Sequence, residues 1–400
     1  MELDCKIQPE LQRKPEHYMD DVSVMNPSVT GIKELSVWSK VQYFNIYSNY
    51  SSDILHDVKL GVLKYGMGHI VYEYIIKRKT FSLRTLNERI DCFNYKRNKF
   101  RNKPPLISAD EVKERKIKMS ASEIQTFFTC FAFYVGDLVQ YDDLWSYYII
   151  LRKIVDLQNA KCLQRGAVKL LETLTTEHHR LYQEIFADTL KPKFHNILHY
   201  FQILLKSGPL HHLNCLRYES KNRFLKLIAS GTSSRRNILH TMAVKEQLNL
   251  CYRLMCKKDL EEHVLMGPAS LISDISCLDK YHLFSPSLPT EFKFRNVEVS
   301  WIEKTGIKYS TNSCVVLSLD LQYLPVFGTI NTIICNEIGH VCFICEVWLN
   351  IGYDEQLHAY EVLKSESYVC WLLCNLHSPF PAIFHKMPNG EYYVALKASI

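Results

Sequence analysis

The sequence lacks the features that mark membrane-spanning, secreted and repetitive proteins. None of its 400 residues lies in an uninterrupted apolar run of about 18, the length that crosses a bilayer as a helix. The opening residues, Met1 to Lys6, carry charge where a secretory signal peptide has an apolar run. The chain also has no internal repeat and no low-complexity tract. We therefore expect a protein that neither spans a membrane nor is secreted.

Regular cysteine spacing is absent as well. The 14 cysteines are scattered along the chain, which is typical of free thiols in a reducing compartment rather than of a disulfide framework. We expect the nucleus or the cytosol. Hydrophobic residues make up 47% of the chain and aromatic residues 12%, enough to bury a sizeable core, and the length suggests two or three domains.

The net charge of +6 is modest, but positive charge is concentrated in one segment. Residues 77–120 hold 14 Lys or Arg and 5 Asp or Glu, an excess of nine positive charges, with aromatic residues between them. Such a segment favours a DNA partner, because each neutralised phosphate releases counterions. The alternative is a solvated loop. The candidate DNA-contacting residues here are Lys96, Arg97, Lys99, Arg101, Lys103, Lys116 and Lys118.

The residue pattern divides the chain into four parts and predicts an α+β fold. Residues 1–50 are polar and contain three prolines, which predicts an extended N-terminal arm. Apolar residues at helical spacing predict a mainly helical domain over 51–265. Glycine and proline mark a linker over 266–291, and short runs of β-branched and aromatic residues over 292–400 predict a small β barrel or sandwich.

Some helix boundaries are visible in the sequence. Ser120, with Glu123 three residues later, fits a capping box at the start of an aromatic-rich helix. Pro192 suits the first turn of a helix that we expect to run over 193–206. Residues 96–119 contain two adjacent prolines and dense charge, which predicts a loop.

Asp53 and His56 form the first candidate site. They lie three residues apart at the predicted start of a helix, so both side chains share one face. A carboxylate near a helix N-terminus is stabilised by the helix dipole and can also bind a divalent cation. The alternative is that Asp53 or Ser52 only caps the helix.

Glu219 is the centre of a second candidate site. It lies among Arg217, Lys221 and Arg223, cations that could keep the carboxylate ionised or bind a phosphate backbone beside it. The alternative is an ordinary helix whose charges pair with one another.

Two further patterns resemble metal sites. His195 and His199, four residues apart, could offer two nitrogen ligands, although histidines bonded to neighbouring helices are the simpler interpretation. Zinc is disfavoured at a set of four cysteines, because the residues between them are strand formers rather than turn formers. That set is Cys342, Cys345, Cys370 and Cys374.

The order of these patterns resembles CACTA-type (EnSpm-like) DNA transposases, especially the animal members, over about residues 15–255. The resemblance depends on a DxxH block and a later "GP…ER" block. The matching residues are Asp53-x-x-His56 with Gly61-Val62, His195 to Tyr200, Gly208-Pro209-Leu210, and Arg217-Tyr218-Glu219-Ser220-Lys221. Shorter similar stretches begin at Thr30, Leu86, Lys118, Gly136 and Ser234.

The resemblance implies an RNase H-like catalytic core with a helical insertion. In such enzymes three acidic residues hold two Mg²⁺ ions for DNA cleavage and strand transfer. By position, Glu219 corresponds to the last acid, and Asp53 with His56 to the DxxH element close to the site. Asp53 and Glu219 are then the expected metal ligands, with Mg²⁺ as the cofactor if the chain is active.

The sequence departs from the family at its N-terminal side. Only 52 residues precede Asp53, too few for the sheet that carries the earlier catalytic aspartates. We therefore expect a truncated or domesticated remnant in the nucleus that binds DNA and lacks full catalytic activity. Its partners would be DNA and either the full-length transposase or a second copy of itself. The alternative is a protein-interaction module with no nucleic-acid role.

Overall fold

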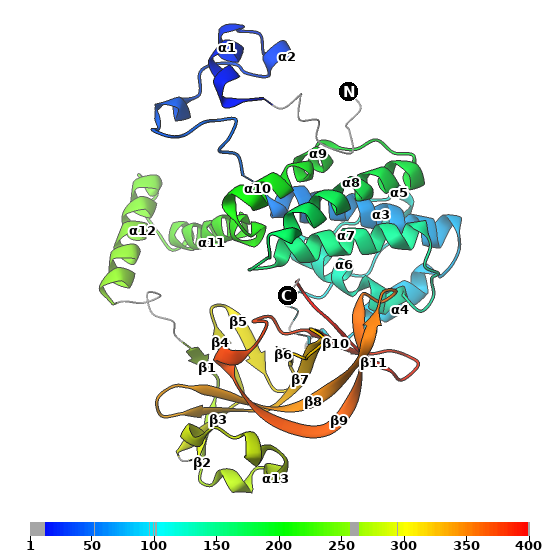
Figure 1. The fold of residues 1–400 in the computed structure, drawn as a ribbon. Coiled ribbons are helices and arrows are strands. Elements are labelled where there is room, and N and C mark those ends of the chain that lie inside the picture. The colour runs from blue at the N-terminus through cyan, green and yellow to red at the C-terminus, as the bar shows by residue number, and fades with distance from the viewer. Residues whose placement is uncertain are drawn as a thin grey trace.

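The fold is α+β, in agreement with the sequence pattern. The computed structural model describes residues 13–398 except residues 52, 96, 99, 101, 257–263 and 294. Figure 1 shows a helical body above a curved sheet, with an N-terminal segment and the helices α11 and α12 standing off the body. All strands among the described residues follow residue 263, so the described part of 53–256 is helices and connections.

The helical body begins with one continuous helical stretch over residues 54–77. Its central part is α3, and π-helical turns precede and follow it. Seven further helices complete the body: α4 (Leu83–Cys92), α5 (Ala109–Glu114), α6 (Ala121–Val135), α7 (Asp143–Asn159), α8 (Gly166–Phe186), α9 (Pro192–Leu198) and α10 (Tyr200–Ser207). The helix α3, at the centre of the stretch over 54–77, spans Leu63–Tyr72.

The local signals for helix starts act as expected. The capping box of Ser120 and Glu123 is present at α6, where each side chain bonds the other residue's backbone N–H. Ser108 and Glu111 form a second capping box at α5, inside the segment expected to be a loop. Pro192 occupies the first turn of α9. The single helix expected over 193–206 is divided between α9 and α10.

The N-terminal segment contains short helices where an extended arm was expected. These are α1 (Tyr18–Ser23) and α2 (Pro27–Thr30). Tyr47 donates a hydrogen bond to Asp21 at 2.7 Å, and the Ser36 backbone N–H donates to Tyr18 at 2.9 Å. The segment is therefore held by its own contacts, and Figure 1 shows it apart from the helical body.

The strands form two antiparallel sheets. The main sheet has the order β10-β11-β9-β8-β7-β3-β2, with β6 paired to β7, and the small sheet has the order β1-β4-β5. The main strands are β2 (Ala269–Ile272), β3 (Asn296–Val299), β6 (Cys314–Leu319), β7 (Pro325–Asn336), β8 (Val341–Asp354), β9 (Ala359–Leu372), β10 (Ile383–Lys386) and β11 (Tyr392–Ala395). The small sheet consists of β1 (Val264–Met266), β4 (Trp301–Lys304) and β5 (Ile307–Ser310).

The prediction of a barrel is wrong, because the main sheet is open. Between β6 and the described residues before β10 there is an isolated bridge, Cys314 to Ala382, and the His377 N–H donates to the carbonyls of β6, but no continuous ladder forms. Pro379 and Pro381 lie beside this bridge and have no backbone N–H to extend it. The strong curvature comes from β8 and β9, whose pairing shifts register at two bulges.

The residues expected to form a linker, 266–291, take part in the β region instead. β2 pairs with β3, and the short helix α13 (Tyr281–Phe284) buries Phe284 against the sheet. Ser287 accepts a hydrogen bond from the Cys370 backbone N–H of β9 at 2.8 Å. The glycines and prolines of this stretch therefore shape turns that pack on the sheet.

One hydrophobic core joins the helical body to the sheet. Buried residues of the C-terminal strands and their connections lie in the same cluster as the helical core, among them Leu357, Ile383 and Tyr393. The Trp145 indole of α7 donates a hydrogen bond to the Gln356 carbonyl at 2.9 Å. The two parts are therefore packed as one body.

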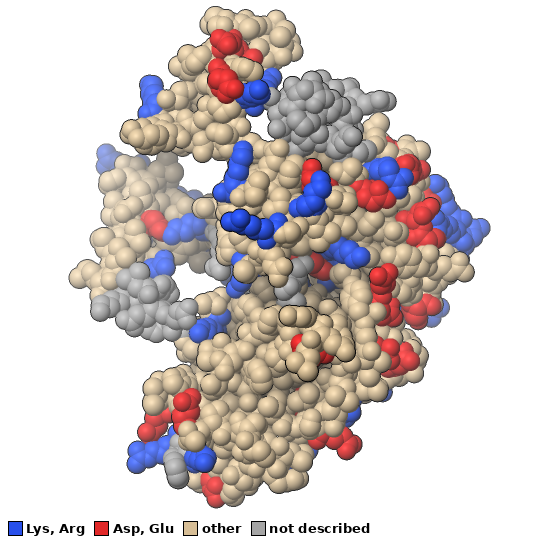
Figure 2. Space-filling view, viewed as in Figure 1, with Lys and Arg blue, Asp and Glu red and all other residues tan. Residues whose placement is uncertain are grey.

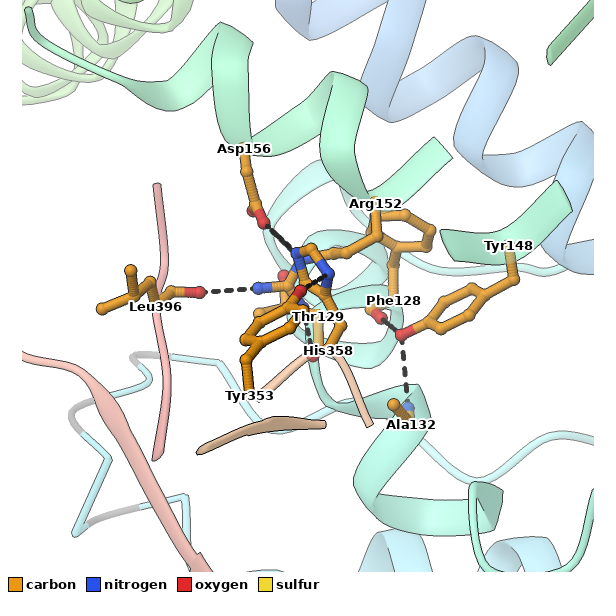
Figure 3. A network of polar contacts seen from close by, with 9 residues as sticks. All are labelled: Phe128, Thr129, Ala132, Tyr148, Arg152, Asp156, Tyr353, His358 and Leu396. Carbon is orange, nitrogen blue, oxygen red and sulfur yellow. Dashed lines mark hydrogen bonds and ion pairs between the residues drawn. The ribbon is translucent and has the colours of Figure 1, made fainter. Parts of the chain in front are cut away.

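A buried polar network lies at the junction between α7 and the β region (Figure 3). Arg152 of α7 is 1% exposed and pairs with Asp156 at 3.0 Å. Its guanidinium also donates to the carbonyls of Thr129, on α6, and Leu396, after β11. His358, just before β9, lies 2.8 Å from Asp156. Every group in the network has a partner, as buried charge requires.

Two helices make little contact with this body. α11 (Leu216–Ser230) and α12 (Ile238–Met255) contain no buried residue among those described, and Figure 1 shows them projecting to one side. Of the described helices, none combines the length and the apolar character that crossing a membrane demands.

Candidate functional site

The candidate site begins at the start of the helical stretch over 54–77. Asp53 has non-helical backbone geometry, and its side chain accepts a hydrogen bond from the Leu55 N–H at 3.1 Å. Ile54, Leu55 and Val58 are buried, which fixes this helix end against the body. Asp53 is therefore the helix cap, the role that the alternative interpretation gave it.

The same aspartate also contacts His56, as the shared helical face predicts. Asp53 Oδ2 lies 2.5 Å from His56 Nδ1. On the other side of the ring, Glu219 Oε1 lies 3.4 Å from Nε2. The fold thus brings the DxxH element to the first turn of α11, and His56 lies between the two candidate acids.

Cys215 completes this group and was not among the expected site residues. Its Sγ lies 3.7 Å from His56 Nδ1, although the two residues are 159 positions apart in the chain. Ligand atoms of Asp53, His56 and Cys215 all lie within 4.8 Å of one another. The sequence held one signal for it: Cys215 precedes Glu219 by four residues, a spacing that places two side chains on one helical face.

The group is accessible to solvent. The side chains of Asp53, His56 and Glu219 are 33%, 49% and 47% exposed. Burial acts to raise the pKa of Asp53, but hydrogen bonds from Cys215 and His56 outweigh it and lower this pKa. Partial burial and the carboxylates of Asp53 and Glu219 raise the pKa of the Cys215 thiol to about 11. Without a metal, Cys215 is therefore a neutral thiol beside an ionised Asp53.

These residues do not fit the Mg²⁺ site that the resemblance implies. Mg²⁺ requires oxygen ligands in octahedral geometry. Asp53 and Glu219 approach opposite nitrogens of His56, so the imidazole ring stands between the two carboxylates. The third ligand atom beside Asp53 and His56 is the sulfur of Cys215, which suits softer ions.

A second carboxylate beside the site has a structural role. Asp57 accepts hydrogen bonds from Asn196 at 2.8 Å and from the Tyr200 hydroxyl at 3.1 Å. These contacts tie α9 and α10 to the helix that carries the DxxH element. Burial, followed by the charge of Asp57, raises the pKa of Tyr200 well above its ordinary value, so the phenol stays a donor.

The histidine pair of α9 and α10 lies close together. His195 Nε2 and His199 Nε2 are 3.2 Å apart, and the His199 ring meets the edge of Tyr50. Burial and the nearby His195 lower the pKa of His199. His195 is exposed, whereas His199 is half-buried. Neither histidine belongs to the three-ligand group found among the described residues.

The basic residues expected to contact DNA have different surroundings. Lys96, Lys99 and Arg101 lie outside the described residues, as does the side chain of Arg217. Arg97 is half-buried and lies 4.2 Å from the Phe384 ring of β10, and burial lowers its pKa. Arg97 therefore takes part in packing the helical body on the sheet.

The other basic candidates are more accessible. Lys103 pairs with Asp91 at 2.5 Å, and Lys221 of α11 pairs with Glu246 of α12. Three more are exposed: Lys116, Lys118 and Arg223. On the face shown in Figure 2, acidic and basic side chains are interspersed rather than gathered in one patch.

The four cysteines considered as a zinc set lie in or beside strands of the β region. Cys342 and Cys345 are buried in β8, Cys370 is buried in β9, and Cys374 is exposed after β9. None of them belongs to the described three-ligand group. Burial raises the pKa of Cys345 well above its ordinary value, as expected of an inert core thiol.

Comparisons with models of protein families, with curated proteins and with solved structures found no match to this chain. The resemblance to CACTA-type transposases therefore stays a prediction from the sequence. The geometry of Asp53, His56, Cys215 and Glu219 is the basis on which function has to be argued.

Proposed function

We propose that the chain is a transposase-derived DNA-binding protein, a remnant of a Mg²⁺-dependent DNA transposase without full catalytic activity. The contact between His56 and Glu219 carries this proposal. The resemblance implies that the DxxH element and the last acid lie near one site, and the two come together although most of the helical body separates them in sequence.

The proposal assigns the helical body to the insertion of an RNase H-like core. In support, the described residues of 53–256 form helices without a strand, and the two site elements lie at the first helix of the body and at α11. Cleavage by two metals needs closely spaced carboxylates. Because His56 lies between Asp53 and Glu219, we expect this chain alone not to cut DNA.

DNA would contact the exposed cations of the basic segment. Lys103, Lys116 and Lys118 are exposed, and Arg223 lies one turn beyond Glu219 on α11. A nuclear location belongs to this proposal, as does pairing with the full-length transposase or with a second copy. The number of phosphates contacted sets the salt dependence of binding, which makes the proposal measurable.

The test is binding of the full chain to a labelled DNA duplex between about 50 and 200 mM salt. We expect the logarithm of affinity to fall linearly with the logarithm of salt concentration. Changing Lys103, Lys116 and Lys118 together to Gln should reduce the slope by about 0.9 for each phosphate that the variant no longer neutralises.

The control removes the same charge from the β region. Lys293, Lys308 and Lys386 are exposed there, and their triple change to Gln should leave most of the slope intact. Absence of salt-dependent binding by the unchanged chain would refute the proposal. Equal slopes for the two triple variants would move the DNA surface away from the basic segment.

The second candidate function is a protein-interaction module with no nucleic-acid role. Its specific support is an apolar patch on the main sheet, where Leu349 and Ile351 of β8 and Leu363 of β9 are each more than half exposed. Leu349 and Leu363 are directly opposite each other in the β8–β9 pairing. A chain that fails to bind DNA at any salt concentration would favour this function.

A further inference from the structure

Three chemically different ligand atoms meet at the start of the helical body. They are a carboxylate oxygen of Asp53, a ring nitrogen of His56 and the sulfur of Cys215, all within 4.8 Å of one another. Two of the residues come from one helix start, and the third lies just before α11. A set of oxygen, nitrogen and sulfur donors selects among metals by their chemistry.

Zn²⁺ and chemically similar divalent ions suit these oxygen, nitrogen and sulfur ligands better than Mg²⁺ does. Zn²⁺ takes thiolate, imidazole and carboxylate ligands at about 2.0–2.3 Å in a tetrahedron, so its ligand atoms are about 3.5 Å apart. Nδ1 of His56 is 3.7 Å from Cys215 Sγ and 2.5 Å from Asp53 Oδ2. To bind the ion, the distance between Asp53 Oδ2 and His56 Nδ1 has to lengthen by roughly 1 Å. A small rotation of these two partly exposed side chains is enough for this change.

Glu219 is placed to orient the histidine rather than to bind the ion. Its Oε1 lies 3.4 Å from Nε2, the ring nitrogen that faces away from Asp53 and Cys215. Histidines that bind a metal through one nitrogen commonly donate their other N–H to a carboxylate, which fixes the ring and its tautomer. The four side chains thus match an inner shell of three residues and an outer carboxylate.

We propose that Asp53 Oδ2, His56 Nδ1 and Cys215 Sγ bind a divalent ion of the zinc class, and that Glu219 orients His56. On binding, the Cys215 thiol loses its proton to solvent and the sulfur binds as thiolate. Solvent can supply the fourth ligand, because His56 and Glu219 are about half exposed. The site depends on these four side chains and not on the proposed DNA binding.

The ion would also fix α11 to the body. No described residue of α11 is buried, so few packing contacts hold this helix in place. A metal shared between the helix start at residue 54 and Cys215 would join the two elements directly. Ligand binding to the folded chain alone raises the melting temperature, which gives a second readout.

The test is titration of the full reduced chain, first treated with a chelator, with Co²⁺ as a coloured substitute for Zn²⁺. We expect one equivalent to give visible d–d bands and a near-ultraviolet thiolate-to-cobalt charge-transfer band, with Zn²⁺ displacing it. Cys215→Ser should abolish the charge-transfer band. Cys277→Ser, at an exposed cysteine of the β region, is the matched control and should keep it.

Glu219→Gln separates a positioning residue from a ligand. We expect this variant to keep the stoichiometry and the charge-transfer band but to bind about 10- to 100-fold more weakly. A charge-transfer band that survives in Cys215→Ser would refute the site. Displacement of Co²⁺ by millimolar Mg²⁺ as readily as by Zn²⁺ would refute the choice of metal, and equal circular dichroism spectra would show that the variants are folded.

Discussion

The helices α7 and α12 have nearly the same length, 17 and 18 residues, but opposite surroundings. α7 buries most of its residues, including Trp145 and Arg152, whereas α12 buries none of its described residues. Both have helical apolar spacing in the sequence. The difference shows that a periodic pattern predicts the helix but not the surface that covers it.

Contacts with other elements explain the difference. α7 packs against α8 and other helices and reaches the β region through Gln356 and Leu396. α12 contacts α11, where Lys221 and Glu246 form an ion pair whose side chains are 45% and 23% exposed. Because tertiary packing supplies most of a helix's stability, α12 should open at a much lower free energy than α7.

The largest effect is expected from breaking the buried network at α7. Arg152→Met leaves Asp156 and the carbonyls of Thr129 and Leu396 without their main donor. Removing one partner of a buried ion pair costs about 3–5 kcal/mol of unfolding free energy. Urea unfolding followed by circular dichroism measures it.

The control for Arg152→Met is the equivalent change in the more accessible pair of Lys221 and Glu246. Lys221→Met breaks the pair with Glu246 and should cost about 1 kcal/mol or less. Replacing Arg152 and Asp156 together by Met and Leu should recover part of the lost stability, because no unpaired charge remains at α7. Equal costs for Arg152→Met and Lys221→Met would remove the contrast between the helices.

A matched leucine pair tests the same contrast without charge. Leu151 of α7 is 0% exposed and Leu248 of α12 is 62% exposed. Leu151→Ala should cost about 2–5 kcal/mol, because it leaves a cavity in the core. Leu248→Ala should change the unfolding free energy by no more than about 0.5 kcal/mol in either direction. A large loss for Leu248→Ala would mean that α12 is covered in solution.

A buried histidine pair of α8 should make the packed body sensitive to acid. The Tyr147 hydroxyl donates to His178 Nε2, the His178 Nδ1–H donates to His179 Nδ1, and the His179 Nε2–H donates to the Phe194 carbonyl. This chain of bonds satisfies both rings in the neutral form. Burial lowers the pKa of His179 from 6.5 to about 4 and that of His178 well below 6.5.

The sign of the pH effect follows from these shifts. As pH falls below 6.5, the unfolded chain takes up protons before the folded chain does, so stability is complete above pH 6.5 and is lost toward pH 4. His179 alone should account for about 2–3 kcal/mol of this loss. Urea unfolding at pH 7, 5.5 and 4.5 measures it.

The variants sharpen this prediction. His179→Gln should reduce the difference in stability between pH 7 and pH 4.5, whatever its cost at pH 7. His240→Gln, at an exposed residue of α12, should leave that difference unchanged. Stability that stays constant from pH 7 to 4.5 in the unchanged chain would contradict the assignment of neutral histidines.

The sequence predicted best those helix caps and turns that form between residues a few positions apart. The Ser120–Glu123 capping box forms within one turn of helix, and Asp53 bonds Leu55 two residues away. The Asn389-Gly390 pair lies in the connection between β10 and β11, where Gly390 has φ 96°. Left-handed backbone there is inexpensive for glycine, so this dipeptide favours the tight connection that the structure has.

Long-range contacts account for what the sequence did not predict. The glycines and prolines over 266–291 predicted a linker, because turns on a sheet and turns in a free segment use the same residues. Arg97 was expected to contact DNA from a loop, but its guanidinium lies 4.2 Å from the Phe384 ring of β10. The sequence gives no local sign that a strand almost 300 residues later packs beside Arg97.

By itself, the sequence determined the α+β class, most helices, and the shared helical face of Asp53 and His56, because each depends on residues a few positions apart. Only the tertiary structure decided that Cys215 and Glu219 meet His56, that the main sheet stays open, and that the helical body and the sheet share one core. These features depend on which distant surfaces bury each other, and burial is set by the whole chain rather than by any local pattern.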